Sequence, residues 1–118
     1  KLLGGGMRQV GVLGAAALCA LDDYEHDHHA MLRADHRRAR TFADALEGLS
    51  GVARVTPPET NIVIFETREP AAEVVRRFTE ADVGVVPFGP HIVRATFHRD
   101  VDDAGLEEAL GVLPTVLG

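Results

Sequence analysis

Three consecutive glycines stand between two cations at the start of the chain. Residues 1–9 read KLLGGGMRQ, and an apolar run follows directly. Glycines let backbone N–H groups come close to a ligand, and a helix starting near Met7 would point the positive end of its dipole to the same place. Lys1 and Arg8 could then bind a phosphate or a carboxylate. A flexible lead-in to a helix with two solvated cations explains the pattern equally well, because short glycine-rich motifs are weak signals.

A second candidate for anion binding is an arginine in a predicted strand. Residues 92–98 read IVRATFH, and side chains in a strand alternate between the two faces of the sheet. We expect the apolar residues 93, 95 and 97 to face helices, and Arg94, Thr96 and His98 to share the other face. An arginine there is costly to bury without an anion, and its planar fork suits a carboxylate. From the residues alone, a structural ion pair or exposure to solvent is the commoner outcome.

The hydrophobic periodicity predicts which elements hold these residues. We expect an apolar helix over Met7–Leu21, buried on most sides, and an amphipathic helical segment over Tyr24–Leu49, with a break near Asp22–Asp27. Strands are predicted at residues 52–55, 61–66, 85–86 and 92–98, a helix begins at Pro70, and Asp102 caps a last helix. This order gives a two-layer α+β domain, with a sheet of three or four strands covered by helices on one face.

Composition and charge exclude several classes of protein. With 118 residues, 46% of them hydrophobic, the chain suits one modest core. A net charge of −6 argues against nucleic-acid binding, which depends on clustered lysine and arginine. The longest apolar stretch, residues 10–21, is too short for a bilayer span, so we expect no membrane partner and a cytoplasmic location. The single cysteine, Cys19, is expected to pack as a small core residue.

A histidine-rich segment contains residue types that can bind a metal ion. Residues 25–29 read EHDHH, but of these only Glu25 and His29 are spaced to share one face of a helix. We therefore expect a solvated helix face there and no metal site. His36 is expected to make a polar contact on the long helix, and His98 to form a hydrogen bond near Asp100.

Four motifs together resemble one enzyme family. They are KLLGGGMRQVG at residues 1–11, Asp35-His36, PETN at 58–61 and RATFHRDV at 94–101. In this order and spacing they resemble the C-terminal part of the low-specificity L-threonine aldolases, pyridoxal-phosphate enzymes of the aspartate aminotransferase fold group. The resemblance implies the small C-terminal domain of that fold, with a mainly antiparallel sheet preceded by long helices. Residues 1–50 would link to a large cofactor-binding domain, and residues 51–118 would form the small domain.

The resemblance also implies a reaction and roles for three residues. Family members cleave L-threonine or L-allo-threonine to glycine and an aldehyde. Arg94 matches the arginine that binds the substrate α-carboxylate. Lys1 and Arg8 match cations near the cofactor phosphate and the substrate, serving the site of a neighbouring subunit in a homotetramer. The lysine that attaches the cofactor lies before the glycine motif in this family, so we expect no catalytic residue in this chain and no activity from the chain alone.

Two alternatives remain open from the sequence. Another pyridoxal-phosphate lyase of the same fold group, such as a β-eliminating lyase, would also place an arginine on this strand. A free-standing interaction domain without catalysis is the other. In either case the apolar residues 10–21 and the sheet face bearing Arg94 would be exposed in the isolated chain, and we expect it to self-associate.

Overall fold

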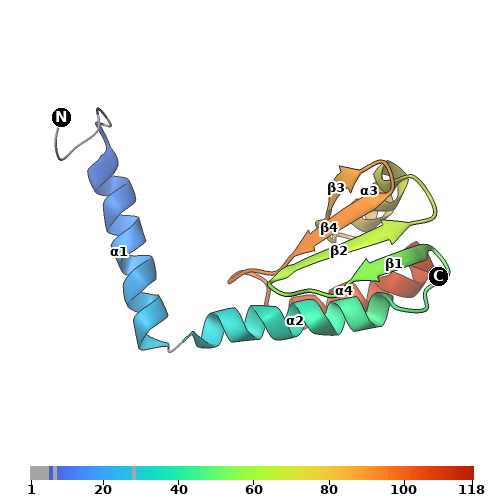
Figure 1. Cartoon of the computed structure of the whole chain (residues 1–118), viewed down its shortest axis with the longest axis horizontal. Coiled ribbons are helices and arrows are strands. Elements are labelled where there is room, and N and C mark those ends of the chain that lie inside the picture. The colour runs from blue at the N-terminus through green and yellow to red at the C-terminus, as the bar shows by residue number, and fades with distance from the viewer. Residues whose placement is uncertain (1–5, 7, 28) are drawn as a thin grey trace. The chain divides into compact units, whose positions relative to one another are not determined.

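The computed structural model describes residues 6, 8–27 and 29–118 (Figure 1). The chain divides into two units, Lys1–Met31 and Leu32–Gly118, of which the structure describes the residues just given. The division at residue 50 concerns a junction with a further domain and stays a prediction.

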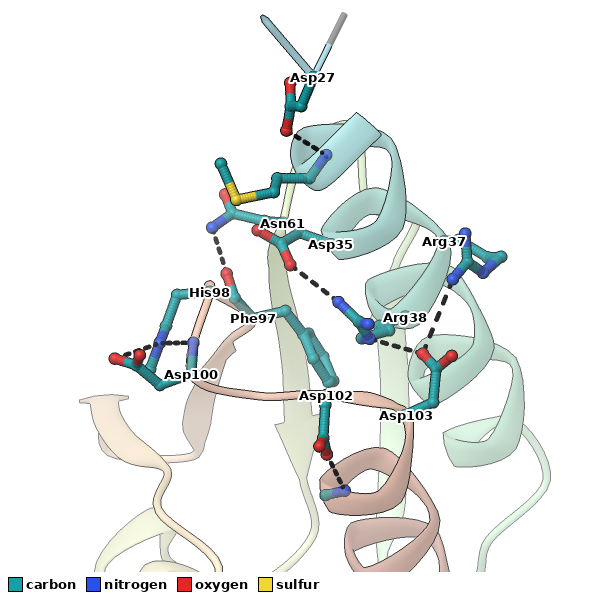
Figure 2. Close-up of polar contacts among 12 residues, drawn as sticks. Asp27, Asp35, Arg37, Arg38, Asn61, Phe97, His98, Asp100, Asp102 and Asp103 are labelled. Atoms are coloured by element: carbon teal, nitrogen blue, oxygen red, sulfur yellow. Dashed lines mark hydrogen bonds and ion pairs between the residues drawn. The ribbon is translucent and has the colours of Figure 1, made fainter. Parts of the chain in front are cut away.

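The first unit consists mainly of one helix. Helix α1 (Val10–His26) is followed by a short break in which His29 has a φ of 65°, and the Asp27 carboxylate accepts a hydrogen bond from the Met31 N–H at 3.1 Å (Figure 2). The predicted helix break is present, but it comes after His26 and not within Asp22–His26, which are helical. The predicted core position of Cys19 is wrong for this chain, because Cys19 is exposed. Helix α1 has no buried residue, which agrees with the expected exposure of residues 10–21 in the isolated chain, and its burial against another domain or subunit stays a prediction.

The second unit holds the sheet and most of the helices. Helix α2 (Ala30–Leu46) begins at the end of the first unit and continues through the second. It is followed by β1 (Val52–Thr56), β2 (Ile62–Thr67), α3 (Ala71–Glu80), β3 (Val86–Gly89), β4 (Ile92–Thr96) and α4 (Asp103–Leu117). All strand pairs are antiparallel, in the order β1-β2-β4-β3 (Figure 1). The predicted α+β fold is confirmed, with four strands and with β4 ending two residues earlier than expected.

One core lies between the sheet and the helices. Its largest fully buried side chains include Phe42 of α2, Phe65 of β2 and Phe78 of α3. Phe42 also meets Phe97 edge to face, with ring centroids 5.7 Å apart, and α4 adds Leu106 and other apolar residues to the same cluster. Because β2 and β4 lie in the middle of the sheet, their inward-facing residues are fixed by packing from three helices.

A polar network joins α2 to the start of α4 (Figure 2). The Arg38 guanidinium donates a hydrogen bond to Asp35 at 3.2 Å and another to Asp103 at 2.7 Å. Asp35 is only 6% exposed, so this pairing offsets the cost of burying its charge. The expected cap is also present, since the Asp102 carboxylate accepts from the Gly105 N–H at 2.9 Å.

Among the described helices, none has the length and apolar character needed to cross a membrane.

Candidate functional site

Arg94 lies in the middle of β4, on the face of the sheet that the helices leave open. It stands opposite Ile64 of β2 on one side and Val86 of β3 on the other. Its neighbours Val93 and Ala95 are buried against the helices, whereas Arg94 itself is half-buried. The alternation predicted from the sequence is therefore confirmed for this strand.

The Arg94 guanidinium has an aromatic neighbour, and none of the described residues supplies an anion to it. Its central carbon lies 5.4 Å from the centroid of the Phe88 ring. Its Nε is buried and has no hydrogen-bond partner. No carboxylate of the described residues forms an ion pair with it, and Glu66, on the same sheet face, pairs with Arg54 at 3.1 Å. An unpaired guanidinium on a partly covered surface is well suited to bind a carboxylate supplied from outside.

The surface around Arg94 is mainly apolar. Ile62, Val86 and Phe88 are exposed by 37%, 43% and 58% of their full areas. Large apolar side chains of this kind, gathered around one charge, are typical of ligand sites and of interfaces with other parts of a protein. The sequence missed Phe88, because this residue lies between the strands predicted at residues 85–86 and 92–98.

His98 does not share the Arg94 strand as expected. Strand β4 ends at Thr96, and His98 lies in the following loop. Its Nδ1 accepts a hydrogen bond from the Asp100 N–H at 3.3 Å and lies 3.7 Å from the Asp100 carboxylate (Figure 2). The expected contact with Asp100 is confirmed, and the loop conformation accounts for the exposure of the imidazole.

The other candidate anion-binding residues belong to the first unit. Arg8 is exposed and precedes Gln9, the N-cap of α1, whose side chain makes no capping hydrogen bond. The backbone N–H groups at this helix start therefore do not donate a hydrogen bond to the cap side chain. Lys1, together with most of the glycine motif, lies outside the described residues. The roles of Lys1 and Arg8 stay predictions.

The histidine-rich segment makes local contacts. The His26 imidazole donates to the Asp22 carbonyl oxygen at 2.7 Å, and the rings of Tyr24 and His29 lie 4.1 Å apart. His28 lies outside the described residues. Within the part of the chain that the structure describes, no three histidine, cysteine or acidic side chains are placed to hold a metal ion. His36 is half-buried on α2.

A cavity of about 210 Å³ lies on the helix side of the sheet. Its lining includes Phe42, Ala95 and Phe97 from the core, together with the acidic residues Asp82 and Glu108. Arg94 is not part of it. The cavity and the candidate site therefore use opposite faces of β4.

Comparison with known protein families gives one match that covers more than half of the chain. Residues 1–70 match the family described as beta-eliminating lyase. The matched segment includes α1, α2 and the first two strands. Arg94 lies beyond it.

Curated relatives extend the similarity to nearly the whole chain. The chain is 36% identical over 115 residues to a probable low-specificity L-threonine aldolase 2 of Arabidopsis thaliana, an alignment that covers 93% of this chain and 31% of that protein. It is 33% identical over 108 residues to a low specificity L-threonine aldolase of Escherichia coli, covering 92% of this chain and 30% of that one. The resemblance to the threonine aldolases is thus confirmed. The chain spans about three tenths of the length of these relatives.

Solved structures identify the fold. An ornithine aminotransferase of Toxoplasma gondii superposes with a TM-score of 0.65 at 15% identity, over 87% of this chain and 26% of that one. The cystine C-S lyase C-DES superposes with a TM-score of 0.58 at 18% identity, over 70% and 23% of the two chains. At these identities the likeness establishes the fold alone. It confirms the expected aminotransferase-like architecture.

Proposed function

Because this chain belongs to the beta-eliminating lyase family, we propose that it is the C-terminal part of a pyridoxal-phosphate-dependent aldolase. The whole enzyme would cleave L-threonine, L-allo-threonine or a related β-hydroxy amino acid to glycine and an aldehyde. The similarity to curated threonine aldolases over more than nine tenths of the chain supports this reaction.

The observation that carries the proposal is the partial burial of Arg94 together with its lack of an ion-pair partner among the described residues. Its guanidinium is half-buried on an open, mainly apolar sheet face, and no described carboxylate pairs with it. An amino acid substrate brings the missing carboxylate. A charge-assisted contact of this kind is about twice as strong as one between neutral groups, and a bidentate contact also fixes orientation.

Arg94 would act by binding and orienting the substrate. Cleavage breaks the Cα–Cβ bond, leaves its electron pair on Cα and converts the β-hydroxyl to the aldehyde carbonyl with loss of its proton. Bound pyridoxal phosphate supplies the conjugated system that accepts this charge. With the α-carboxylate held by β4, rotation about the neighbouring bonds is restricted, so the Cα–Cβ bond can be kept in the orientation that the reaction requires.

Arg8 is placed to bind an anionic group of the cofactor or the substrate. It is an exposed cation next to a helix start that has no side-chain cap, a combination that favours a phosphate or a carboxylate. We assign Arg8 and Lys1 to the cofactor phosphate or the nearby substrate, in a site shared between subunits of a homo-oligomer. The cytoplasmic location stays a prediction.

The test is an assay of the full-length protein that carries this chain. Loaded with pyridoxal phosphate, it should release acetaldehyde and glycine in equal amounts from L-threonine or L-allo-threonine. The 118-residue chain alone should release neither. Absence of aldehyde release from any β-hydroxy amino acid tested would contradict the proposal.

The family match and the fold of C-DES favour one second candidate, β-elimination. Such an enzyme would also need an arginine for the α-carboxylate, so the geometry of Arg94 does not separate the two reactions. The products do, because elimination from L-cysteine or L-cystine gives pyruvate. Pyruvate release with no aldehyde release would favour the second candidate.

A further inference from the structure

The edge strand β3 contains an irregularity next to Arg94. Val86 stands opposite Arg94 and Pro87 opposite Val93, but the next partner of β4, Ile92, stands opposite Gly89. Phe88 is therefore the extra residue of a β-bulge. Bulges change the direction of a side chain, and they are common beside active sites.

The bulge brings the Phe88 ring to the Arg94 guanidinium. The distance of 5.4 Å from the guanidinium carbon to the ring centroid lies within the range of a cation–π contact. Gly89 permits the close return of the chain, because a Cβ at that position would come within 3.2 Å of the Ile92 side chain. Phe88 itself is 58% exposed, so the core gives little reason for a phenylalanine there.

The burial and hydrogen bonding of the Arg94 nitrogen atoms indicate how the Phe88 ring acts on the guanidinium. Nε is buried without a hydrogen bond, and a ligand in the present conformation therefore cannot reach it. The two terminal nitrogens remain as the pair of donors for a carboxylate. A flat ring against the guanidinium limits its rotation without using any of its N–H groups.

We propose that Phe88 is a positioning residue for Arg94, an inference that rests on the proposed function. Its ring holds the guanidinium plane so that the two terminal nitrogens face the substrate α-carboxylate. The bulge at residues 87–89 is the element that places the ring. Phe88 touches the arginine and takes no part in bond breaking.

The first test compares Phe88→Leu with Phe88→Tyr in the full-length protein loaded with pyridoxal phosphate. Leucine removes the ring and keeps an apolar side chain, whereas tyrosine keeps the ring. In Phe88→Leu, KM for the β-hydroxy amino acid should rise about three- to fivefold with kcat changed less than about twofold. Phe88→Tyr should restore KM to within about twofold of the wild type.

The second test asks whether the effect acts through the carboxylate. Dissociation constants of glycine and glycinamide are measured for the same proteins from the absorbance of the cofactor. Phe88→Leu should weaken glycine binding about three- to fivefold and leave glycinamide binding unchanged. An equal loss for both ligands indicates a general structural effect and overturns the proposal.

The third test does not depend on the reaction. In the 118-residue chain without cofactor, the NMR signal of the Arg94 Nε–H group should carry a ring-current shift that disappears in Phe88→Leu and remains in Phe88→Tyr. Arg94→Lys assigns the signal. Loss of this shift with an unchanged KM, or an unchanged signal, overturns the positioning role. A wild-type enzyme that cleaves no β-hydroxy amino acid overturns the proposed function, while glycine binding and the NMR signal still decide the role of Phe88.

Discussion

Asn61 and Phe97 form a reciprocal pair of hydrogen bonds at the open end of the β2–β4 ladder, and Figure 2 shows the one made by the Asn61 side chain. The Asn61 Nδ2 donates to the Phe97 carbonyl oxygen at 2.5 Å, and the Phe97 N–H donates to the Asn61 carbonyl oxygen at 2.9 Å. The pair extends the ladder by one residue beyond Thr96. It also holds the Phe97 ring in the core against Phe42.

Replacing the Asn61 side chain should destabilise the second unit. In Asn61→Ala the Phe97 carbonyl loses its side-chain donor in a part-buried place, and we expect the free energy of unfolding to fall by about 1–2 kcal/mol. Urea denaturation of the 118-residue chain followed by circular dichroism measures the change. Thr60→Ala is the matched control: its hydroxyl accepts a single exposed bond from Ile62 at 3.3 Å, so a loss below about 0.5 kcal/mol is expected. Equal losses in the two variants would contradict the assignment.

The Arg38 network should contribute more to the free energy of unfolding than any exposed ion pair among the described residues. In Arg38→Met, the buried Asp35 carboxylate loses its cation, and the free energy of unfolding should fall by about 3 kcal/mol. Urea unfolding at neutral pH measures this loss.

The other charges of the network provide the controls. Arg37 is 61% exposed and lies 3.7 Å from Asp103, so Arg37→Gln should cost less than about 1 kcal/mol. The double variant Asp35→Asn, Arg38→Met should recover part of the loss, because the unpaired buried charge is gone. If the double variant recovers none of the lost stability, the loss in Arg38→Met comes from changed packing around the methionine and not from the unpaired charge of Asp35.

The face on which Arg94 lies could be predicted from the sequence. Alternating apolar residues at positions 93, 95 and 97 require a buried partner on one side, and this requirement leaves only one orientation for the arginine. The cap of the last helix and most strand positions follow from equally local signals, such as the aspartate at position 102. These features depend on neighbours within a few residues.

The missed features depend on contacts between distant residues. The place of Phe88 follows from a bulge, which depends on the register between two strands and leaves no periodic pattern in the sequence. Arg38 pairs with the buried Asp35 and also with Asp103, which is 68 positions after Asp35 in the chain. The burial of Cys19 was predicted wrongly for a related reason: an apolar pattern predicts that a helix tends to be covered, but not which element covers it.

Substitution of Arg94 should separate binding from folding. In the full-length enzyme, Arg94→Gln removes the charge and the bidentate contact, and we expect kcat/KM to fall about 10²- to 10³-fold. Because no described carboxylate pairs with Arg94, the same change in the 118-residue chain should alter the free energy of unfolding by less than about 0.5 kcal/mol. Steady-state kinetics and urea unfolding measure the two effects. A large loss of stability would instead place Arg94 among the structural residues.

Helix α1 should make the isolated chain self-associate. Its side chains are apolar on several sides, and Leu13, Leu18 and Leu21 are exposed by 60%, 69% and 57%. A helix with this pattern is stable in water only when another surface covers it, and in the isolated 118-residue chain a second copy is the available partner. Sedimentation velocity should show dimers or larger species at micromolar concentration.

Leu13→Glu with Leu21→Glu should shift the distribution to monomer. Thr56→Glu with Thr115→Glu adds the same charge at exposed positions of the second unit and should leave the association unchanged. A monomeric wild-type chain, or equal dissociation in both double variants, would contradict this role of α1.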